Sequence, residues 1–176
     1  MADVFETRCV SPSFCNSKHL IRIACIGDSM MYGQGVVSRH TLPAHLARFL
    51  NAALPDHLAW VDNFGESSGN VWDAWAGMKR RLRDQHFDAI VFSVCDNDST
   101  LLDSVALTYP GDDGLYRRFW EEETVQFRRL AAVFADLQTV CAAQNVIPLV
   151  FFYSIMPDDK NSVDIFSRLM QTLNIT

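Results

Sequence analysis

The sequence lacks the long apolar segment that a membrane-spanning helix requires. No apolar run approaches the roughly 20 residues that cross a bilayer, although 49% of the residues are hydrophobic. The first six residues, MADVFE, also lack the basic and apolar regions of a secretory signal peptide. We therefore expect a cytoplasmic protein without a membrane partner.

Cysteine is sparse and shows no paired spacing. The five cysteines stand at positions 9, 15, 25, 95 and 141, and no two of them form a CxxC pair. An odd number of scattered cysteines is typical of neither a disulfide framework nor a zinc site. We expect reduced, mostly buried thiols and no metal.

The chain has fewer basic than acidic residues, 15 against 21, and lacks flexible linkers. Its formal net charge is −6 and its pI is near 5.2, which opposes a general affinity for polyanions, so we expect no nucleic-acid partner. The one basic stretch, residues 79–83, is interpreted as a solvated helix face. No Pro/Gly/Ser-rich segment divides the 176 residues, which predicts an irregular segment over 1–19 and one domain over 20–176.

Apolar periodicity predicts alternating strands and helices. Strands are expected near 21–26, 59–63, 88–94 and 146–153, and helices near 41–55, 70–85, 116–144 and 162–173. Such alternation gives repeated βαβ units, hence an α/β fold with a mostly parallel sheet and helices on both faces.

Small and polar residues follow three of these strands. Gly27-Asp28-Ser29 follows the first, Asn63-Phe64-Gly65 closes the second, and Asn97-Asp98-Ser99 follows the third. Because parallel strands end at one rim of a sheet, these residues are expected to lie together, with Ser29 in the position of a nucleophile. Taken separately, Gly-Asp-Ser is a common turn, and Asn97 could cap a helical segment. Asp28 is expected to hold the turn through side-chain to backbone hydrogen bonds.

These blocks resemble the first three sequence blocks of the SGNH (GDSL-type) hydrolases, in residues, order and spacing. The matching segments are Gly27-Asp28-Ser29 with Tyr32-Gly33, the glycines within residues 63–69, and Cys95-Asp96-Asn97-Asp98. The resemblance implies a flavodoxin-like three-layer α/β/α sandwich, and an esterase, lipase, thioesterase or acetyltransferase that uses neither a metal nor an organic cofactor.

The resemblance also implies roles for particular residues. Ser29 would be the nucleophile, and its amide, a glycine amide from the second block and the Asn97 side chain would form the oxyanion hole. Gly69 is favoured as that glycine, with Gly65 as the alternative. Asp28, Gly65 and Asp98 are expected to border the substrate.

The sequence departs from the family pattern at the block that supplies the catalytic base. The family's last block is an Asp-x-x-His pair, whereas no acidic residue here precedes a histidine by three positions, and no histidine follows His86. The five histidines are expected to be surface or capping residues. We therefore expect the last strand and the last block to be lost from this chain or supplied by sequence beyond it.

Three functions remain open at this stage. The leading hypothesis is a serine ester hydrolase that acts on a small-molecule or carbohydrate ester through an acyl-enzyme, or an O-acetyltransferase of the same type. The second is a non-catalytic module that binds an acylated sugar or similar ligand. The third, a phosphate-binding flavodoxin-like domain, is disfavoured because residues 27–35 contain no lysine.

The expected lack of a last strand would leave one edge of the sheet unpaired. Without it, the apolar strand at residues 147–153 would be an open edge, and open apolar edges are usually covered. We expect the N-terminal segment, the C-terminal helix or the same strand of a second copy, as a homodimer, to cover it.

Overall fold

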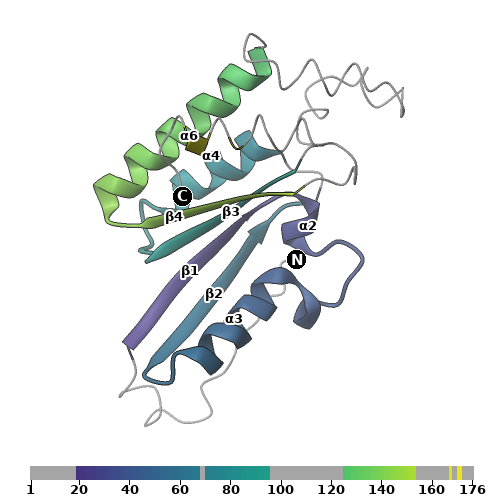
Figure 1. The fold of residues 1–176 in the computed structure, drawn as a ribbon, viewed down its shortest axis with the longest axis vertical. Coiled ribbons are helices and arrows are strands. Elements are labelled where there is room, and N and C mark those ends of the chain that lie inside the picture. Colours follow the sequence, from purple (N-terminus) through teal and green to yellow (C-terminus); the bar gives the residue numbers. More distant parts are fainter. Residues whose placement is uncertain (1–18, 68–69, 96–124, 154–166, 168–169, 172–176) are drawn as a thin grey trace.

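A computed structural model describes residues 19–67, 70–95, 125–153, 167 and 170–171. Within these residues the chain forms four strands, four α-helices and one 3₁₀ turn, and strands alternate with helices along the chain (Figure 1). In chain order they are β1 (His19–Gly27), α2 (Ser29–Tyr32), a 3₁₀ turn (Ser38–His40), α3 (Leu42–Ala53), β2 (His57–Gly65), α4 (Val71–Arg81), β3 (Ala89–Cys95), α6 (Val125–Gln144) and β4 (Ile147–Tyr153).

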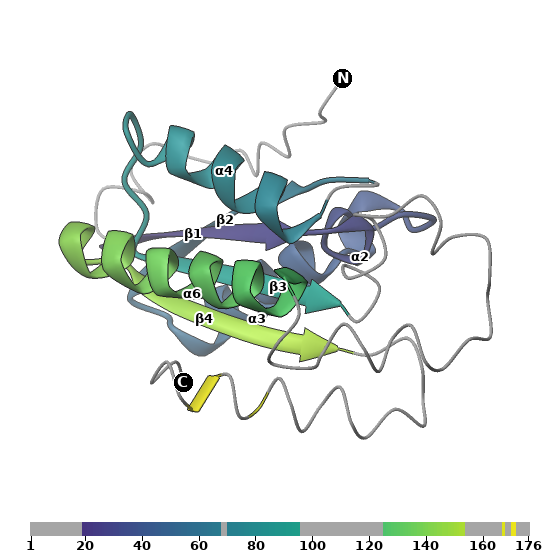
Figure 2. The same ribbon diagram turned by 90° about the horizontal axis from the view of Figure 1, so that it is seen from above.

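The expected α/β fold is confirmed. The strands form one parallel sheet in the order β2-β1-β3-β4. Figure 1 and Figure 2 show α4 and α6 over one face of this sheet and α3 against the other. Each strand differs by a few residues at most from its predicted bounds. Residues 116–124 and most of the predicted helix over 162–173 lie outside the described residues, while 167, 170 and 171 are helical.

Two side-chain caps explain where the principal helices begin. The Thr41 hydroxyl accepts a hydrogen bond from the Ala44 amide at 3.4 Å and thereby caps α3. The Asn70 side chain accepts from the Trp72 and Asp73 amides at 3.0 and 2.9 Å. Both caps satisfy amides that the first helical turn leaves without partners.

The larger core lies between the sheet and the helices α4 and α6. Its members share near-complete burial and include Ile26, Trp75, Phe92, Phe134 and Leu137. The core on the α3 side is smaller and is built around Ile23, Cys25, Met31 and Val91. Strands β1 and β3 contribute to both cores, which is why their sequences are almost continuously apolar.

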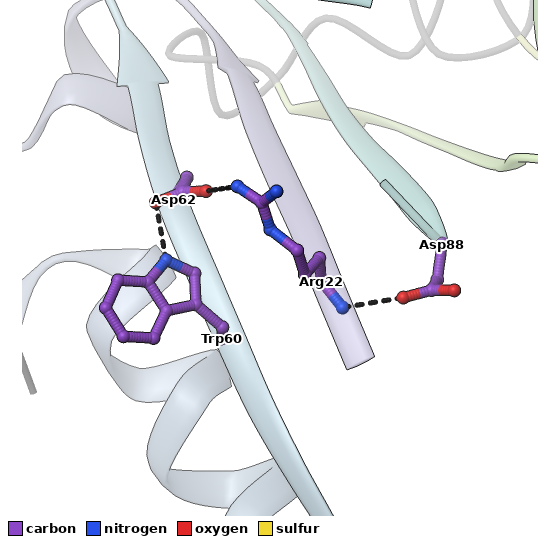
Figure 3. A network of polar contacts seen from close by, with 4 residues as sticks. All are labelled: Arg22, Trp60, Asp62 and Asp88. Atoms are coloured by element: carbon purple, nitrogen blue, oxygen red, sulfur yellow. Dashed lines mark hydrogen bonds and ion pairs between the residues drawn. The ribbon is translucent and has the colours of Figure 1, made fainter. Parts of the chain in front are cut away.

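A polar network fixes the sheet near the amino ends of its strands (Figure 3). The Arg22 guanidinium contacts Asp62 at 3.3 Å, and Asp62 also accepts a 2.7 Å hydrogen bond from the Trp60 indole. The Arg22 amide donates to the Asp88 carboxylate at 2.7 Å. The guanidinium also lies 4.9 Å from the centre of the Phe87 ring. These contacts join β1, β2 and the start of β3 at the end of the sheet remote from Ser29.

Strand β4 pairs with β3 alone within the described residues. Ile147 and Leu149 on this strand are 61% and 46% exposed. The Ile147 amide bonds to the Asp88 carbonyl, so the nitrogen of Pro148 faces the open edge, because successive residues in a strand bond to alternate sides. Proline at such a position is typical of an edge strand. Pairing of this edge with a second copy stays a prediction.

No helix within the described residues is long and apolar enough to cross a membrane.

Candidate active site

The turn after β1 is built by Gly27 and Asp28. Gly27 has a φ of 152°, and a Cβ on it would collide with the Ser93 hydroxyl of the neighbouring strand. Asp28 caps the short helix α2, since its carboxylate accepts a hydrogen bond from the Met30 amide at 3.1 Å. The predicted structural role of Asp28 in this turn is confirmed.

Ser29 is the first residue of α2, the short helix that follows the carboxyl end of β1 (Figure 1). Its side chain is half-buried. Among the described residues, neither its amide nor its hydroxyl has a hydrogen-bond partner, whereas its carbonyl accepts from the Gly33 and Gln34 amides at 3.0 and 2.9 Å. The backbone of the turn is therefore held, while both donor groups of Ser29 have no acceptor in the described part of the chain.

A tyrosine from β4 anchors the same turn. The Tyr153 hydroxyl lies 2.6 Å from each carboxylate oxygen of Asp28. Asp28 is only 4% exposed, so its carboxylate depends on donors within the protein. Burial, followed by the bond to Asp28, raises the pKa of Tyr153 well above its usual value, which keeps the phenol protonated as a donor. The sequence analysis missed this residue, although its position at a strand end was available as a signal.

The end of β2 packs directly on α2, the short helix that begins at Ser29. The Gly65 amide donates to the Asn63 side chain at 3.0 Å, and the Asn63 side-chain amide donates to the Tyr32 carbonyl at 3.3 Å. A Cβ on Gly65 would lie 2.6 Å from the Met31 carbonyl carbon and 2.8 Å from the Tyr32 Cα. Only glycine fits this contact, and its amide is already bound to Asn63.

Gly69, Asn97 and Asp98 lie outside the described residues, so their predicted places beside Ser29 stay predictions. The last described residue before Asn97 is Cys95, which ends β3 and pairs in register with Tyr153. Gly27 pairs in register with Gly65. The four strands therefore end at one rim, which is the rim that carries Ser29.

The five histidines are all described, and three of them lie far from Ser29. His19 and His57 pair at the amino ends of β1 and β2, and His86 precedes β3, 3.7 Å from Asp88. All three lie at the end of the sheet opposite Ser29. His40 and His45 each have a ring nitrogen in contact with an arginine, at 3.2 and 2.9 Å.

A groove of about 610 Å³ runs between α4 and α6 on one face of the sheet. Along it, Asp136 accepts hydrogen bonds from Lys79 at 2.6 Å and from the Trp75 indole at 2.8 Å. The Lys79 bond, then the Trp75 bond, lower the pKa of Asp136. Trp75 is 2% exposed and Trp72 packs against the same core, as expected for core residues. The Trp72 indole nitrogen is buried without a partner among the described residues.

The described part of the chain contains no group of three or more His, Cys, Asp or Glu residues able to hold a metal ion. Cys25 is buried, and burial raises the pKa of its thiol to about 12. This thiol is therefore a poor competitor of Ser29 as a nucleophile.

No protein-family model matches the sequence, and no curated protein is significantly similar to it. Solved structures do match. The SGNH-hydrolase family esterase AlinE4 is 18% identical, with a TM-score of 0.61 over 89% of this chain and 74% of its own. TesA is 16% identical, with a TM-score of 0.62 over 86% and 72%. A two-domain esterase (CEX) active on acetylated mannans is 12% identical, with a TM-score of 0.60 over 90% and 37%. The chain therefore has the fold of the SGNH esterases.

Proposed function

We propose that this chain carries the nucleophile of an SGNH-type serine esterase, with Ser29 attacking the carbonyl carbon of a carboxylic ester. The observation that carries the proposal is the construction of the Ser29 turn. A buried carboxylate, a tyrosine two strands away and a glycine contact from β2 all hold this one backbone segment, while the Ser29 hydroxyl is left without a partner among the described residues.

The reaction follows from the groups at this rim. The Ser29 oxygen forms a bond to the carbonyl carbon as its proton passes to a base, and the carbonyl oxygen gains negative charge. The Ser29 amide, which has no acceptor among the described residues, is one donor for that charge. Collapse of this intermediate expels the alcohol and leaves an acyl-enzyme, which water or an acceptor hydroxyl then cleaves.

The remaining oxyanion donors are assigned to Gly69 and Asn97. Because the Gly65 amide is already bonded to Asn63, its use as a donor would require that bond to break, and this favours Gly69 over Gly65. Asp28 and Asp98 flank the nucleophile and Asn97 in sequence. The Asp28 carboxylate is buried and bonded to Tyr153, so its contribution is to the shape of the turn.

The proton acceptor is not among the five histidines of this chain. Three lie at the opposite end of the sheet, and two are in contact with arginine side chains. Loss of one member of a serine triad costs on the order of 10⁴ in rate. The isolated chain is therefore nearly inactive, and its ester chemistry requires a base from elsewhere.

The test is chemical rescue of ester hydrolysis. The purified chain should hydrolyse a short-chain aryl ester no faster than Ser29→Ala, and added imidazole should raise the rate of the wild type above that of the variant. Equal rates for the two proteins at every imidazole concentration would remove Ser29 from the reaction. Fast hydrolysis without imidazole that Ser29→Ala abolishes would show that one of the five histidines is the base.

The second candidate function is a binding module for an acylated sugar or similar ligand. The observation that favours it is the position of His19, His57 and His86 at the end of the sheet opposite Ser29. Titration of an acetylated oligosaccharide, followed by calorimetry and intact mass, separates the two candidates. Binding without any mass increase on Ser29, with or without imidazole, would support the binding module.

A further inference from the structure

The segment after the nucleophile is free of acidic residues. No Asp or Glu occurs between Asp28 and Asp56, although the chain contains 21 acidic residues. This segment forms α2, the loop that follows it and α3, and the loop projects from one corner of the fold (Figure 1). The local charge there is positive in a protein whose net charge is −6.

Exposed apolar side chains concentrate in the same segment. Nine large apolar residues are exposed in the described part of the chain, and five of them fall within residues 30–42. These five are Met30, Tyr32, Val36, Val37 and Leu42, at 56%, 52%, 52%, 59% and 41% exposure. An exposed apolar concentration of this kind is typical of an interaction surface.

The parts of this segment are in contact with one another. A Cβ on Gly33 would lie 3.2 Å from the Thr41 Cβ and 3.3 Å from a Val36 methyl group. The end of α2, the loop and the start of α3 therefore pack against one another, directly after Ser29 in the chain.

Four exposed basic side chains accompany the apolar residues. Arg48 donates to the Arg39 carbonyl at 2.7 Å and contacts the His45 ring at 2.9 Å, while Arg39 donates to the His40 ring at 3.2 Å. In the part of the chain that the structure describes, neither arginine has a carboxylate partner. We name the whole set the cationic–apolar surface: Met30, Tyr32, Val36, Val37, Arg39, His40, Leu42, His45 and Arg48.

We propose that the cationic–apolar surface binds a bilayer that contains anionic lipid. Stable binding to a membrane surface requires two signals, an apolar one that enters the interface and a basic one that meets lipid phosphates. Val36 and Val37 supply the first at the projecting loop, and Arg39 and Arg48 supply the second beside it. The expectation of no membrane partner was drawn from the lack of a spanning segment, and surface binding needs none.

The pairing of charge with exposed apolar groups favours lipid over a nucleic acid. A phosphate backbone is met by basic and polar side chains, and it would leave two adjacent valines, each more than half exposed, without an apolar partner. Glu66 is an acidic residue near this surface, since the preceding Gly65 packs on Tyr32, whereas charges more than about 10 Å away are screened at 0.1 M salt.

The test is cosedimentation of the whole chain with vesicles. Vesicles of phosphatidylglycerol and phosphatidylcholine in equal parts should bind the protein, and vesicles of phosphatidylcholine alone should bind it much less. Replacing Arg39 and Arg48 by glutamine should lower the partition coefficient about fivefold per arginine. The pair Val36→Ser and Val37→Ser should lower it on both kinds of vesicle.

Matched controls come from the opposite end of the molecule. Arg80→Gln with Arg83→Gln removes two exposed arginines of the basic stretch at the end of α4, and Leu20→Ser removes a 53% exposed apolar residue near the start of β1. Both variants should bind as the wild type does. Ser29→Ala should also bind normally, so this test is independent of the proposed esterase activity.

The proposal is wrong if the wild type does not sediment with the anionic vesicles, or if the Arg80/Arg83 variant loses as much binding as the Arg39/Arg48 variant. It is also wrong if millimolar glycerol phosphate, added to the anionic vesicles, saturates the protein and abolishes its sedimentation, because the site would then be a pocket for a free phosphate.

Discussion

The hydrogen bond between Tyr153 and Asp28 gives a prediction with a defined magnitude. Tyr153→Phe removes the hydroxyl and leaves the packing of the ring in place. The Asp28 carboxylate is 4% exposed and would retain the Met30 amide as its remaining donor among the described residues. A hydrogen bond to a charged group contributes about 1.5–3 kcal/mol, so the free energy of unfolding should fall by about 2 kcal/mol.

Urea unfolding followed by circular dichroism measures this change. In thermal unfolding of a domain of this size, the same 2 kcal/mol corresponds to a fall of roughly 4–8 °C in Tm. The matched control is Tyr32→Phe, because Tyr32 is 52% exposed and its hydroxyl has no hydrogen-bond partner in the described residues, so its loss should cost less than about 0.5 kcal/mol.

A double-mutant cycle with Asp28→Asn then tests the pair itself. If the two residues interact, the cost of Tyr153→Phe should shrink in the Asp28→Asn background. A Tyr153→Phe variant as stable as Tyr32→Phe, or equal costs in both backgrounds, would refute the claim that β4 anchors the nucleophile turn.

Three further predictions concern packing, charge and thiols. Gly65→Ala should destabilise the protein by about 1–3 kcal/mol or more, because the added Cβ would meet the backbone of α2. Gly77→Ala should stabilise the protein by about 0.5–1 kcal/mol, because a Cβ there would lie in an open part of α4 with no atom nearer than 3.8 Å. Thermal unfolding of both variants measures the two changes. The pKa of Asp136 is lowered in the folded protein. The ionised carboxylate therefore adds stability above the pKa of an unfolded aspartate, and this stability is lost as the pH falls through the folded pKa. Asp136→Asn should flatten the acid limb of the curve of unfolding free energy against pH by less than about 1 kcal/mol, because the Lys79–Asp136 pair is partly exposed. Cys25 and Cys141 are buried, and their pKa values are raised to about 12 and about 11. Peptide mapping after iodoacetamide treatment at pH 8 should therefore find both thiols unmodified in the folded protein and modified in guanidinium. Equal modification in both states would contradict their burial.

The elements of the fold could be predicted because their signals are local. The apolar run at 21–26 and the helical spacing after Thr41 specify a strand and a helix without reference to the rest of the chain. The parallel arrangement of the sheet followed from the alternation of these elements, but alternation does not specify its strand order, β2-β1-β3-β4. The turn at Asp28 was predictable for the same reason, since its capping bond reaches only two residues along the chain.

The Tyr153–Asp28 pair could not be predicted in the same way. Its members are 125 residues apart. The strand-end position of Tyr153 indicates the rim of the sheet, but nothing in the sequence around it distinguishes a phenol that bonds a carboxylate from one that packs against Phe151. Likewise, the packing of Gly65 on α2 depends on the register of β1 and β2. Such contacts arise from tertiary structure, which residue type and spacing alone do not specify.

The most direct test of the central claim is the intact mass of the protein after reaction with an activated acetyl ester in the presence of imidazole. We predict a single acetyl addition that peptide mapping places on Ser29, and its absence in Ser29→Ala. Acetylation at another residue, or the same adduct in Ser29→Ala, would contradict the assignment of Ser29 as the nucleophile.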